Sequence, residues 1–386
     1  MNFDLTEDQL AFKMTARKFA EQQLAPNAKA WDAESLFPKS TFVEAGKLGL
    51  MAMYIPEAQH GIGLSRLDSA IIMEELAFGC TSTAAFISIH NMAFNMLARY
   101  GQPELQDRWS ADLASGEKLA SYCLTEPGSG SDAASLSTRA VRDGDSYVVN
   151  GSKAFISGAG STDLLVTMVR TGEAGPKGVS CLAIPASTPG ISFGKKEEKL
   201  GWNSQPTRTI TFEDVRVPVD HRLAAEGEGF KLAMEGLDGG RINIAACSVG
   251  TASASLALAT QYVKERQQFN QALAEFQTTQ FKLADMLTEL VASRQMIYLA
   301  ADHLDKKHPE RSAYCAMAKR LATDLGFRIC DEALQLHGGY GYIREYPIER
   351  HFRDSRVHRI LEGTNEIMRL IVARRLLSDE NFSLIH

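Results

Sequence analysis

The sequence lacks the short motifs that identify several large classes of enzyme. None of its 386 residues forms the phosphate-binding pattern GxxxxGK[ST], the zinc-protease pattern HExxH or the hydrolase pattern GxSxG. The stretches GSGSD (128–132) and GAGSTD (158–163) lack the third glycine of a dinucleotide-binding fingerprint, and neither follows a β-α-β pattern. We therefore exclude the common nucleotide-binding and hydrolase classes.

Paired cysteines, basic tracts and long apolar runs are also missing. The six cysteines are scattered, without a CxxC pair or a histidine at metal-ligand spacing, which predicts free thiols, a reducing compartment and no metal site. The net charge of −6 and the absence of a basic tract argue against a nucleic-acid partner. No run reaches the roughly 18 apolar residues of a membrane span, and MNFDLTEDQL lacks the features of a signal or transit peptide. We expect no membrane span, and a location in the cytoplasm for a bacterial chain or the mitochondrial matrix for a processed eukaryotic one.

Apolar periodicity divides the chain into a helical, a β-rich and a second helical part. In residues 5–24 apolar side chains recur at intervals of three and four, with Thr6 as a plausible N-cap. Residues 81–100 form a long apolar stretch that predicts a buried helix ending at Gly101.

The middle and last thirds have different patterns. Short β-rich runs separated by glycine and proline fill residues 120–220, and Asn150-Gly151 predicts a hairpin turn between two of them. Long helical stretches rich in small residues return at Gly229, which predicts an antiparallel bundle. The predicted domains are 1–119, 120–224 and 225–386.

Three stretches remain as candidates for chemistry. The first is YCLTEPGSGSDAAS (122–135), where main-chain N–H groups and hydroxyls could converge on a planar or anionic ligand, although by itself such a stretch is more often a connecting loop. The second is QLHGGYGY (335–342), in which Gly338 could be only a helix C-cap. The third is Glu362, an acid placed between Leu361 and Gly363.

Together these stretches resemble the acyl-CoA dehydrogenase family over essentially the whole chain. CLTEPGSGSDAAS is similar to the family's first signature, and QLHGGYGYIREYPIERHFRD is similar to its second, with Glu345, Arg350 and Asp354 in place. The implied fold is mainly α with a β domain: an N-terminal helical domain, a middle β-barrel-like domain and a C-terminal four-helix bundle.

The resemblance implies an FAD enzyme that desaturates an acyl-CoA between its α and β carbons. Glu362, in the motif Glu-Gly-Thr, would remove the α-proton, the β-hydride would pass to the flavin, and the electrons would go to an electron-transferring flavoprotein. Loss of hydration should raise the pKa of Glu362 and make it a stronger base, while Gly363 permits a tight turn. One branch of the family carries its base at the position of Gly240, so Glu362 has no rival here.

The resemblance also assigns binding residues. Arg266 and the stretch beginning at Gln335 would meet FAD held by a neighbouring chain, which requires an oligomer, and a homotetramer is the family habit. The implied FAD contacts are Tyr122, Cys123, Leu124, Thr125, Gly130, Ser131, Phe155, Ile156, Ser157, Arg266, Phe269, Gln277, Gln335, Leu336, His337, Gly338, Gly339, Thr364, Asn365 and Glu366. The implied substrate contacts are Ser131, Asp238, Gly239, Gly240, Arg241 and Arg374.

The acyl chain is predicted from longer stretches. KLGWNSQPTRTITFEDVRVP, GLDGGRINIAACSVG and DSRVHRILEGTNEIMR most resemble the branch of the family that acts on isobutyryl-CoA in valine degradation. The pair Gly239-Gly240 would remove side chains beside the acyl pocket and admit a branched chain. Short straight-chain and 2-methyl-branched substrates stay as alternatives, because one methylene changes binding by only about 1–3 kcal/mol. An acyl-CoA oxidase that uses oxygen and a helical scaffold without flavin are the other two interpretations.

Overall fold

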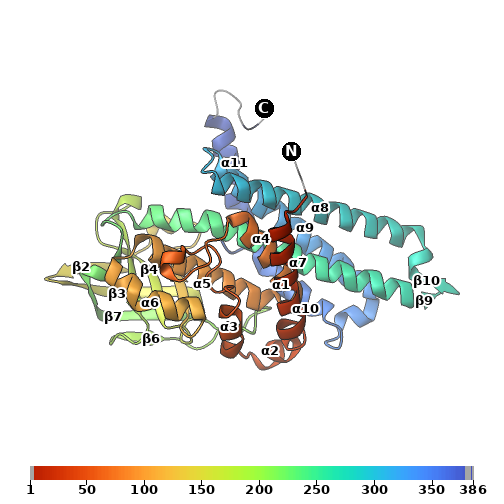
Figure 1. The fold of residues 1–386 in the computed structure, drawn as a ribbon, viewed down its shortest axis with the longest axis horizontal. Helices are drawn as coiled ribbons and strands as arrows, with labels where there is room; N and C mark the ends of the chain where they lie inside the picture. The colour runs from red at the N-terminus through yellow and green to blue at the C-terminus, as the bar shows by residue number, and fades with distance from the viewer. Residues whose placement is uncertain (1–3, 379–383, 385–386) are drawn as a thin grey trace.

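The structure, a computed structural model, describes residues 4–378 and 384. Along the chain the sheet domain stands between two helical domains, and in space the sheet lies at one end of the molecule (Figure 1). This order of helical, sheet and helical domains confirms the predicted fold class. The six cysteines are all buried and free, as their scattered positions predicted.

The N-terminal domain is helical. Its first helix is capped as predicted, because the Thr6 hydroxyl accepts a hydrogen bond from the Gln9 main-chain N–H while the Gln9 side chain accepts one from Thr6. Residues 81–100 form the predicted buried helix. The helices are α1 (Glu7–Phe19), the π-helical turn η1 (Ala20–Leu24), α2 (Ala28–Glu34), α3 (Lys39–Gly46), α4 (Arg66–Gly79), α5 (Thr81–Tyr100) and α6 (Pro103–Ser115).

The middle domain is an eight-stranded sheet with strand order β6-β7-β3-β2-β4-β5-β8 and with β1 parallel to β4. Its apolar core is separate from the main core of the helical domains. The strands are β1 (Ala120–Cys123), β2 (Arg139–Asp143), β3 (Ser146–Ser157), β4 (Leu164–Arg170), β5 (Val179–Pro185), β6 (Ile191–Phe193), β7 (Thr207–Pro218) and β8 (Arg222–Leu223).

The predicted hairpin turn at Asn150-Gly151 is wrong. Both residues lie inside β3, where the pairing with β7 shifts register between Val149 and Gly151. The Asn150 side chain bonds across to Asp214 on β7 instead of closing a turn. The turn that joins β2 to β3 contains Gly144 instead, whose φ is 61°. An Asn-Gly pair therefore marks a bulge here, because the flanking pairs with β7 continue on both sides of it.

The C-terminal domain consists of α7 (Gly229–Glu265), α8 (Gln277–Asp305), α9 (Arg311–His337), α10 (Ile348–Arg356) and α11 (Asn365–Ser378). The first three pack against one another, α7 also packs on α4 and α5, and α11 projects from the body of the molecule (Figure 1). A hairpin of β9 (Gln267–Gln268) and β10 (Gln271–Ala272) joins α7 to α8. Among the described residues, α7 is the one helix long and apolar enough to cross a membrane, but 83% of its apolar window is buried inside the protein. It is therefore the central helix of the core.

Candidate active site

Glu362 lies on a tight turn between two helical segments. The short helix η8 (Val357–Arg359) precedes it and α11 follows it. Glu362 and Gly363 both have left-handed backbones, with φ of 55° and 86°. This conformation disfavours residues with a Cβ, so its presence at an acidic residue indicates a position held by the surrounding structure. Thr364 then begins the next helix, since its hydroxyl accepts a hydrogen bond from the Ile367 N–H.

The Glu362 carboxylate is aimed into the interior. Its Oε2 atom is buried and has no hydrogen-bond partner among the described residues. A Cβ added at Gly240 would lie 2.9 Å from the Glu362 Cδ and 3.2 Å from the Met92 Sδ, so the carboxylate fills the space that glycine leaves on α7. Burial raises the pKa of Glu362 to about 7, against the opposing influence of Arg241 and Lys319. Such a carboxylate can accept a proton near neutral pH.

Two buried residues of α7, Asp238 and Arg241, support this turn. Arg241 donates to Asp238 through Nη1 at 2.7 Å and to the Glu362 main-chain oxygen through Nε at 3.4 Å. Asp238 is buried and also accepts a hydrogen bond from the Ser312 hydroxyl on α9. Both carboxylate oxygens of Asp238 are therefore used inside the protein, and a substrate-binding role for Asp238 and Arg241 stays a prediction.

The other predicted substrate residues occupy different surroundings. A Cβ at Gly239 would overlap the guanidinium of Arg66, which stacks at 3.7 Å on the Tyr54 ring, so this glycine makes room for an arginine. Ser131 is exposed on its loop. Arg374 is exposed on α11 and lines a hollow of about 360 Å³ together with Pro309.

The first glycine-rich stretch is pinned to the sheet by a buried ion pair. Lys153 on β3 is fully buried and donates to Glu126 at 2.7 Å and to the Leu124 main-chain oxygen at 3.1 Å. Glu126 also accepts from the main-chain N–H groups of Ser137 and Thr138. Burial raises the pKa of Glu126, but Lys153 and these hydrogen bonds outweigh it and lower the pKa to about 2. The loop is therefore fixed by a carboxylate that is ionised at neutral pH.

The residues beside this pair divide into interior and ligand-facing positions. The side chains of Cys123 and Ile156 lie in the core of the sheet domain, so only their main chains can contact a ligand. Thr125 pairs with the sheet, because its oxygen accepts from the Ala154 N–H at 2.8 Å. The main-chain oxygen of the partly buried Ser157 likewise accepts a hydrogen bond from the Ser121 hydroxyl.

Three features of this loop and of the neighbouring strand β3 fit a large flat aromatic ligand. Phe155 on β3 is 69% exposed although its ring is apolar, and its φ of 56° falls where the pairing with β7 shifts register between Lys153 and Ile156. The hydroxyl of Tyr122 is buried and has no partner in the described part of the chain, and it lies close enough to Glu362 for that carboxylate to raise the pKa of Tyr122 further after burial. A Cβ at Gly130 would meet no heavy atom within 4 Å. The residues predicted for the flavin ring therefore leave apolar and polar groups free to bind it.

A second group of predicted residues gathers at the far end of α7 and α9. Arg266, Gln335, Leu336, His337, Gly338 and Gly339 line a hollow of about 440 Å³. The His337 ring is buried and stacks at 4.4 Å on Tyr262, whereas a Cβ added at Gly338 or Gly339 would meet no heavy atom within 4 Å. Phe269 is 89% exposed at the hairpin tip, and Gln277 is exposed at the start of α8. An exposed cation, open glycines and an exposed aromatic suit the anionic part of a dinucleotide.

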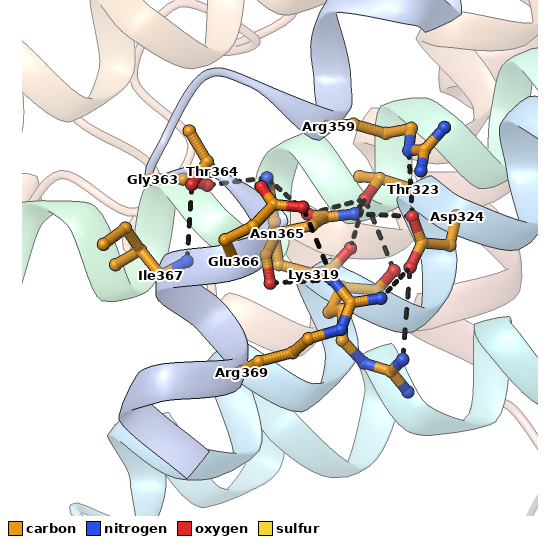
Figure 2. A network of polar contacts seen from close by, with 11 residues as sticks. Lys319, Thr323, Asp324, Arg359, Gly363, Thr364, Asn365, Glu366, Ile367 and Arg369 are labelled. Atoms are coloured by element: carbon orange, nitrogen blue, oxygen red, sulfur yellow. Dashed lines mark hydrogen bonds and ion pairs between the residues drawn. The ribbon is translucent and has the colours of Figure 1, made fainter. Parts of the chain in front are cut away.

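The residues after the turn lie in different environments. Asn365 is buried, and its amide bonds to Lys319, Thr323 and Asp324 (Figure 2). Its side chain is therefore occupied by the protein, so only its main chain can meet FAD. Glu366 is exposed on the first turn of α11.

Sequence reasoning missed three residues around the turn at Glu362, namely Lys319, Met92 and Arg66. Lys319 gave one signal, because it stands in AMAKRLATDLG at helical spacing from Ala316, Ala322 and Thr323, on a face of small residues. A cation on such a face either lies at the edge of the buried face of the helix or is itself buried and has a specific role. The other two carry no local signal, because they approach Gly239 and Gly240 only through tertiary packing.

Three family models together match most of the chain. They are the acyl-CoA dehydrogenase N-terminal domain over residues 6–117, the middle domain over 121–215 and the C-terminal domain over 227–377. The chain belongs to the acyl-CoA dehydrogenase family. It is an acyl-CoA dehydrogenase, and its cofactor is FAD.

Three relatives match this chain over nearly its full length. The chain is 56% identical to the mitochondrial isobutyryl-CoA dehydrogenase of Dictyostelium discoideum, with 98% of this chain and 91% of that one covered. It is 53% identical to the mitochondrial isobutyryl-CoA dehydrogenase of Bos taurus, covering 97% and 90%. The mitochondrial short-chain specific acyl-CoA dehydrogenase of Bos taurus is 42% identical, with 97% and 91% covered.

Solved structures share the whole fold. A chain in the structure of the electron transferring flavoprotein of Acidaminococcus fermentans has a TM-score of 0.95 and 38% identity, with 98% of this chain and 100% of that one covered. Butyryl-CoA dehydrogenase from Megasphaera elsdenii has a TM-score of 0.94 and 37% identity, with the same coverage.

Proposed function

We propose that this chain oxidises isobutyryl-CoA to methacrylyl-CoA in valine degradation and that its electrons pass to an electron-transferring flavoprotein. The observation that carries the proposed chemistry is the buried Oε2 atom of Glu362, which has no hydrogen-bond partner among the described residues and belongs to a carboxylate whose pKa is raised to about 7. The choice of acyl chain is supported by identities of 56% and 53% to two isobutyryl-CoA dehydrogenases against 42% to a short-chain enzyme.

Glu362 acts as the base in this mechanism. An α-proton next to a thioester is weakly acidic, so its removal needs a strong, desolvated base and donors placed where negative charge develops on the thioester oxygen. The Glu362 Oε2 takes the proton, and the Glu362 main-chain N–H polarises the thioester carbonyl. Bound FAD supplies the acceptor for the hydride that leaves the β carbon.

The surrounding residues orient that base. Gly240 leaves room for the carboxylate, and Met92 provides an apolar wall beside it. Arg241, held by Asp238, fixes the main chain of the turn at the Glu362 oxygen. When an acyl chain covers the carboxylate, water is excluded and its basicity increases further.

The binding residues keep the roles that the family assigns to them, as proposals. FAD would lie along the loop that begins at Tyr122 and against Phe155, with its pyrophosphate reached by Arg266 of a neighbouring chain. Acyl-CoA would pass Ser131, Gly239 and Gly240, with Arg374 near the CoA moiety. These assignments are supported by the unpartnered Tyr122 hydroxyl, the exposed Phe155 ring and the hollow at Arg266.

A homotetramer is proposed for the assembly. The exposed face of α8 carries Phe281, Leu287, Val291 and Leu299, which are 64%, 53%, 43% and 43% exposed. Apolar side chains in such a row are expected to be covered by another chain. Phe269, exposed at the tip of the hairpin that precedes α8 in the chain, would then meet FAD of the partner.

Electron acceptor and location are also proposals. The structural similarity to a chain in the electron transferring flavoprotein structure of Acidaminococcus fermentans supports such a flavoprotein as the partner. The mitochondrial names of the isobutyryl-CoA relatives support a matrix location if the chain is eukaryotic. For a bacterial chain, the cytoplasm stays the prediction.

A dye-reduction assay over five acyl-CoA esters tests the substrate. We expect the highest kcat/KM with isobutyryl-CoA, lower values with 2-methylbutyryl- and butyryl-CoA, and the lowest with isovaleryl- and octanoyl-CoA. A preference for butyryl-CoA would favour a short straight-chain enzyme. Peroxide release at the rate of substrate oxidation would favour an oxidase, and a colourless protein that never binds FAD would leave only the scaffold interpretation.

A further inference from the structure

Lys319 on α9 is a fully buried cation whose direct hydrogen bonds are all to neutral groups. Its Nζ donates at 2.8 Å to the main-chain oxygen of Gly363 and at 2.8 Å to the Oδ1 of Asn365 (Figure 2). No carboxylate within the described residues lies within ion-pair distance of this ammonium. Burying a cation without a paired anion is costly, so a neutral side chain would serve simple packing better.

The charged groups that face Lys319 come from each element packed around it. They are Glu362 on the turn, Arg241 on α7, Asp324 on α9 itself and Glu366 on α11. The ammonium also contributes to lowering the pKa of His358 on η8. Asp324 is already held by Arg359 at 2.9 Å and Arg369 at 3.1 Å. Arg241 is already paired with Asp238. Glu366 is exposed to solvent and lies 3.9 Å from Arg369. The interior charge left to balance Lys319 is therefore that of Glu362.

His358 adds no charge near pH 7. Burial lowers the pKa of His358 to about 3, so its ring is neutral there and its Nδ1 shares a hydrogen bond with the Ser248 hydroxyl. Burial likewise lowers the pKa of Lys319 to about 7, and attraction to Glu362 works against that decrease. The turn and α9 thus bring one buried acid and one buried cation close to each other without direct contact.

We propose that Lys319 is a positioning residue for the reaction: it fixes the left-handed turn at Gly363 and supplies the positive charge that keeps Glu362 able to ionise beneath the acyl chain. This inference rests on the proposed role of Glu362 as the base. Through the Gly363 oxygen, the ammonium is tied to the residue that directly follows Glu362. Through the Asn365 side chain, it is tied to the first turn of α11.

Removal of the ammonium would have two separable consequences. The Gly363 oxygen would lose its donor, and the turn could relax by a fraction of an ångström or more, which misplaces the base. A misplacement of about 1 Å costs on the order of 100-fold in rate. The pKa of Glu362 would also rise, because one of the two cations that oppose its increase is lost.

The test compares Lys319→Met with Arg320→Met. The second variant removes a cation from the next residue of the same helix, whose nearest carboxylate is Asp324 at 4.0 Å. For K319M we expect kcat to fall about 10- to 100-fold, with little change in KM, in the FAD absorbance spectrum or in the melting temperature. The acid limb of its pH profile of kcat/KM should move to higher pH, whereas R320M should keep the wild-type kcat and limb.

Several outcomes would overturn the inference. A wild-type kcat and pH profile in K319M would do so, and so would an equal displacement of the limb in R320M, which would reduce the effect to net charge. If K319M does not fold, Lys319→Arg replaces it, with a wild-type acid limb and at least a tenfold lower kcat expected; a wild-type kcat there would contradict a positioning role. Glu362→Gln separates the two hypotheses, because its retained activity would remove the proposed base itself, whatever K319M shows.

Discussion

Two segments of the candidate site each combine a buried lysine with a glutamate, and the pKa values of the two glutamates are shifted in opposite directions. In the sheet domain, Lys153 contacts Glu126 directly at 2.7 Å, and the pKa of Glu126 is lowered to about 2. In the C-terminal domain, Lys319 bonds to the carbonyl next to Glu362 but not to its carboxylate, and the pKa of Glu362 is raised to about 7.

The difference shows that pairing decides the direction in which the pKa of an acid removed from water is shifted. Both carboxylates are removed from water, which by itself raises the pKa of each. Glu126 receives a salt bridge and main-chain hydrogen bonds, so its charge is fully compensated. Glu362 keeps one oxygen without a partner and is left available to take a proton.

The largest expected effect tests the reactive member of the comparison. Glu362→Gln keeps the size of the side chain but removes its basicity, so kcat should fall by about 10²–10⁴-fold, the usual contribution of a general base. FAD absorbance and the melting temperature should stay near wild type, because Oε2 forms no hydrogen bond to the described protein. Turnover at the wild-type rate in a folded, yellow E362Q would eliminate Glu362 as the base.

The space around the base provides the next prediction. In Gly240→Ala the new methyl group would press on the Glu362 carboxylate and on Met92. We expect kcat to fall on the order of 100-fold by displacement of the base. Gly236→Ala is the matched control one turn earlier on α7, because its Cβ would make only ordinary contacts of 3.5 Å and 3.7 Å with Met96 and Met92. Equal losses in the two variants would assign the effect to helix α7 in general.

The structural pair should respond in stability. Lys153→Met leaves Glu126 buried and unpaired, which costs about 3–5 kcal/mol of unfolding free energy for a broken buried ion pair. Urea unfolding measures this change, and FAD retention should weaken with it because the loop after Leu124 loses its anchor. The double variant Lys153→Met/Glu126→Gln should recover part of the loss. A K153M protein as stable as wild type would show that neither the ion pair nor the hydrogen bonds of Lys153 contribute to stability.

The pH dependence gives the smallest effect and separates the two acids. Glu362 must be ionised to act as a base, so kcat/KM should decrease as pH falls below about 7, by up to tenfold per pH unit. Glu126 has a lowered pKa, so its contribution to stability is present above the ordinary glutamate pKa of 4.5 and is lost only as pH falls toward about 2. The contribution of the Glu126 pair to the free energy of unfolding should therefore be constant between pH 6 and 8, whereas kcat/KM should change over that range. A flat activity profile across pH 6–8 would argue against the raised pKa.

Much of the fold followed from local patterns in the sequence. The Thr6 cap, the buried helix 81–100 and the return of helix at Gly229 are all present. The Asn150-Gly151 turn is not, because a local turn preference was outweighed by pairing with β7 on both sides. Local signals therefore succeed where each segment buries one face and fail where a neighbouring strand decides the backbone.

The amino-acid sequence by itself determined the order of helical and sheet domains, the two glycine-rich stretches and the acid at 362, because each depends on periodicity or on residues adjacent in the chain. Only the tertiary structure decided the state of that acid. Its environment comes from Gly240, Arg241 and Lys319 on two helices distant in sequence. A pKa is set by every charge and solvent boundary around a group, and these exist only once the chain has folded.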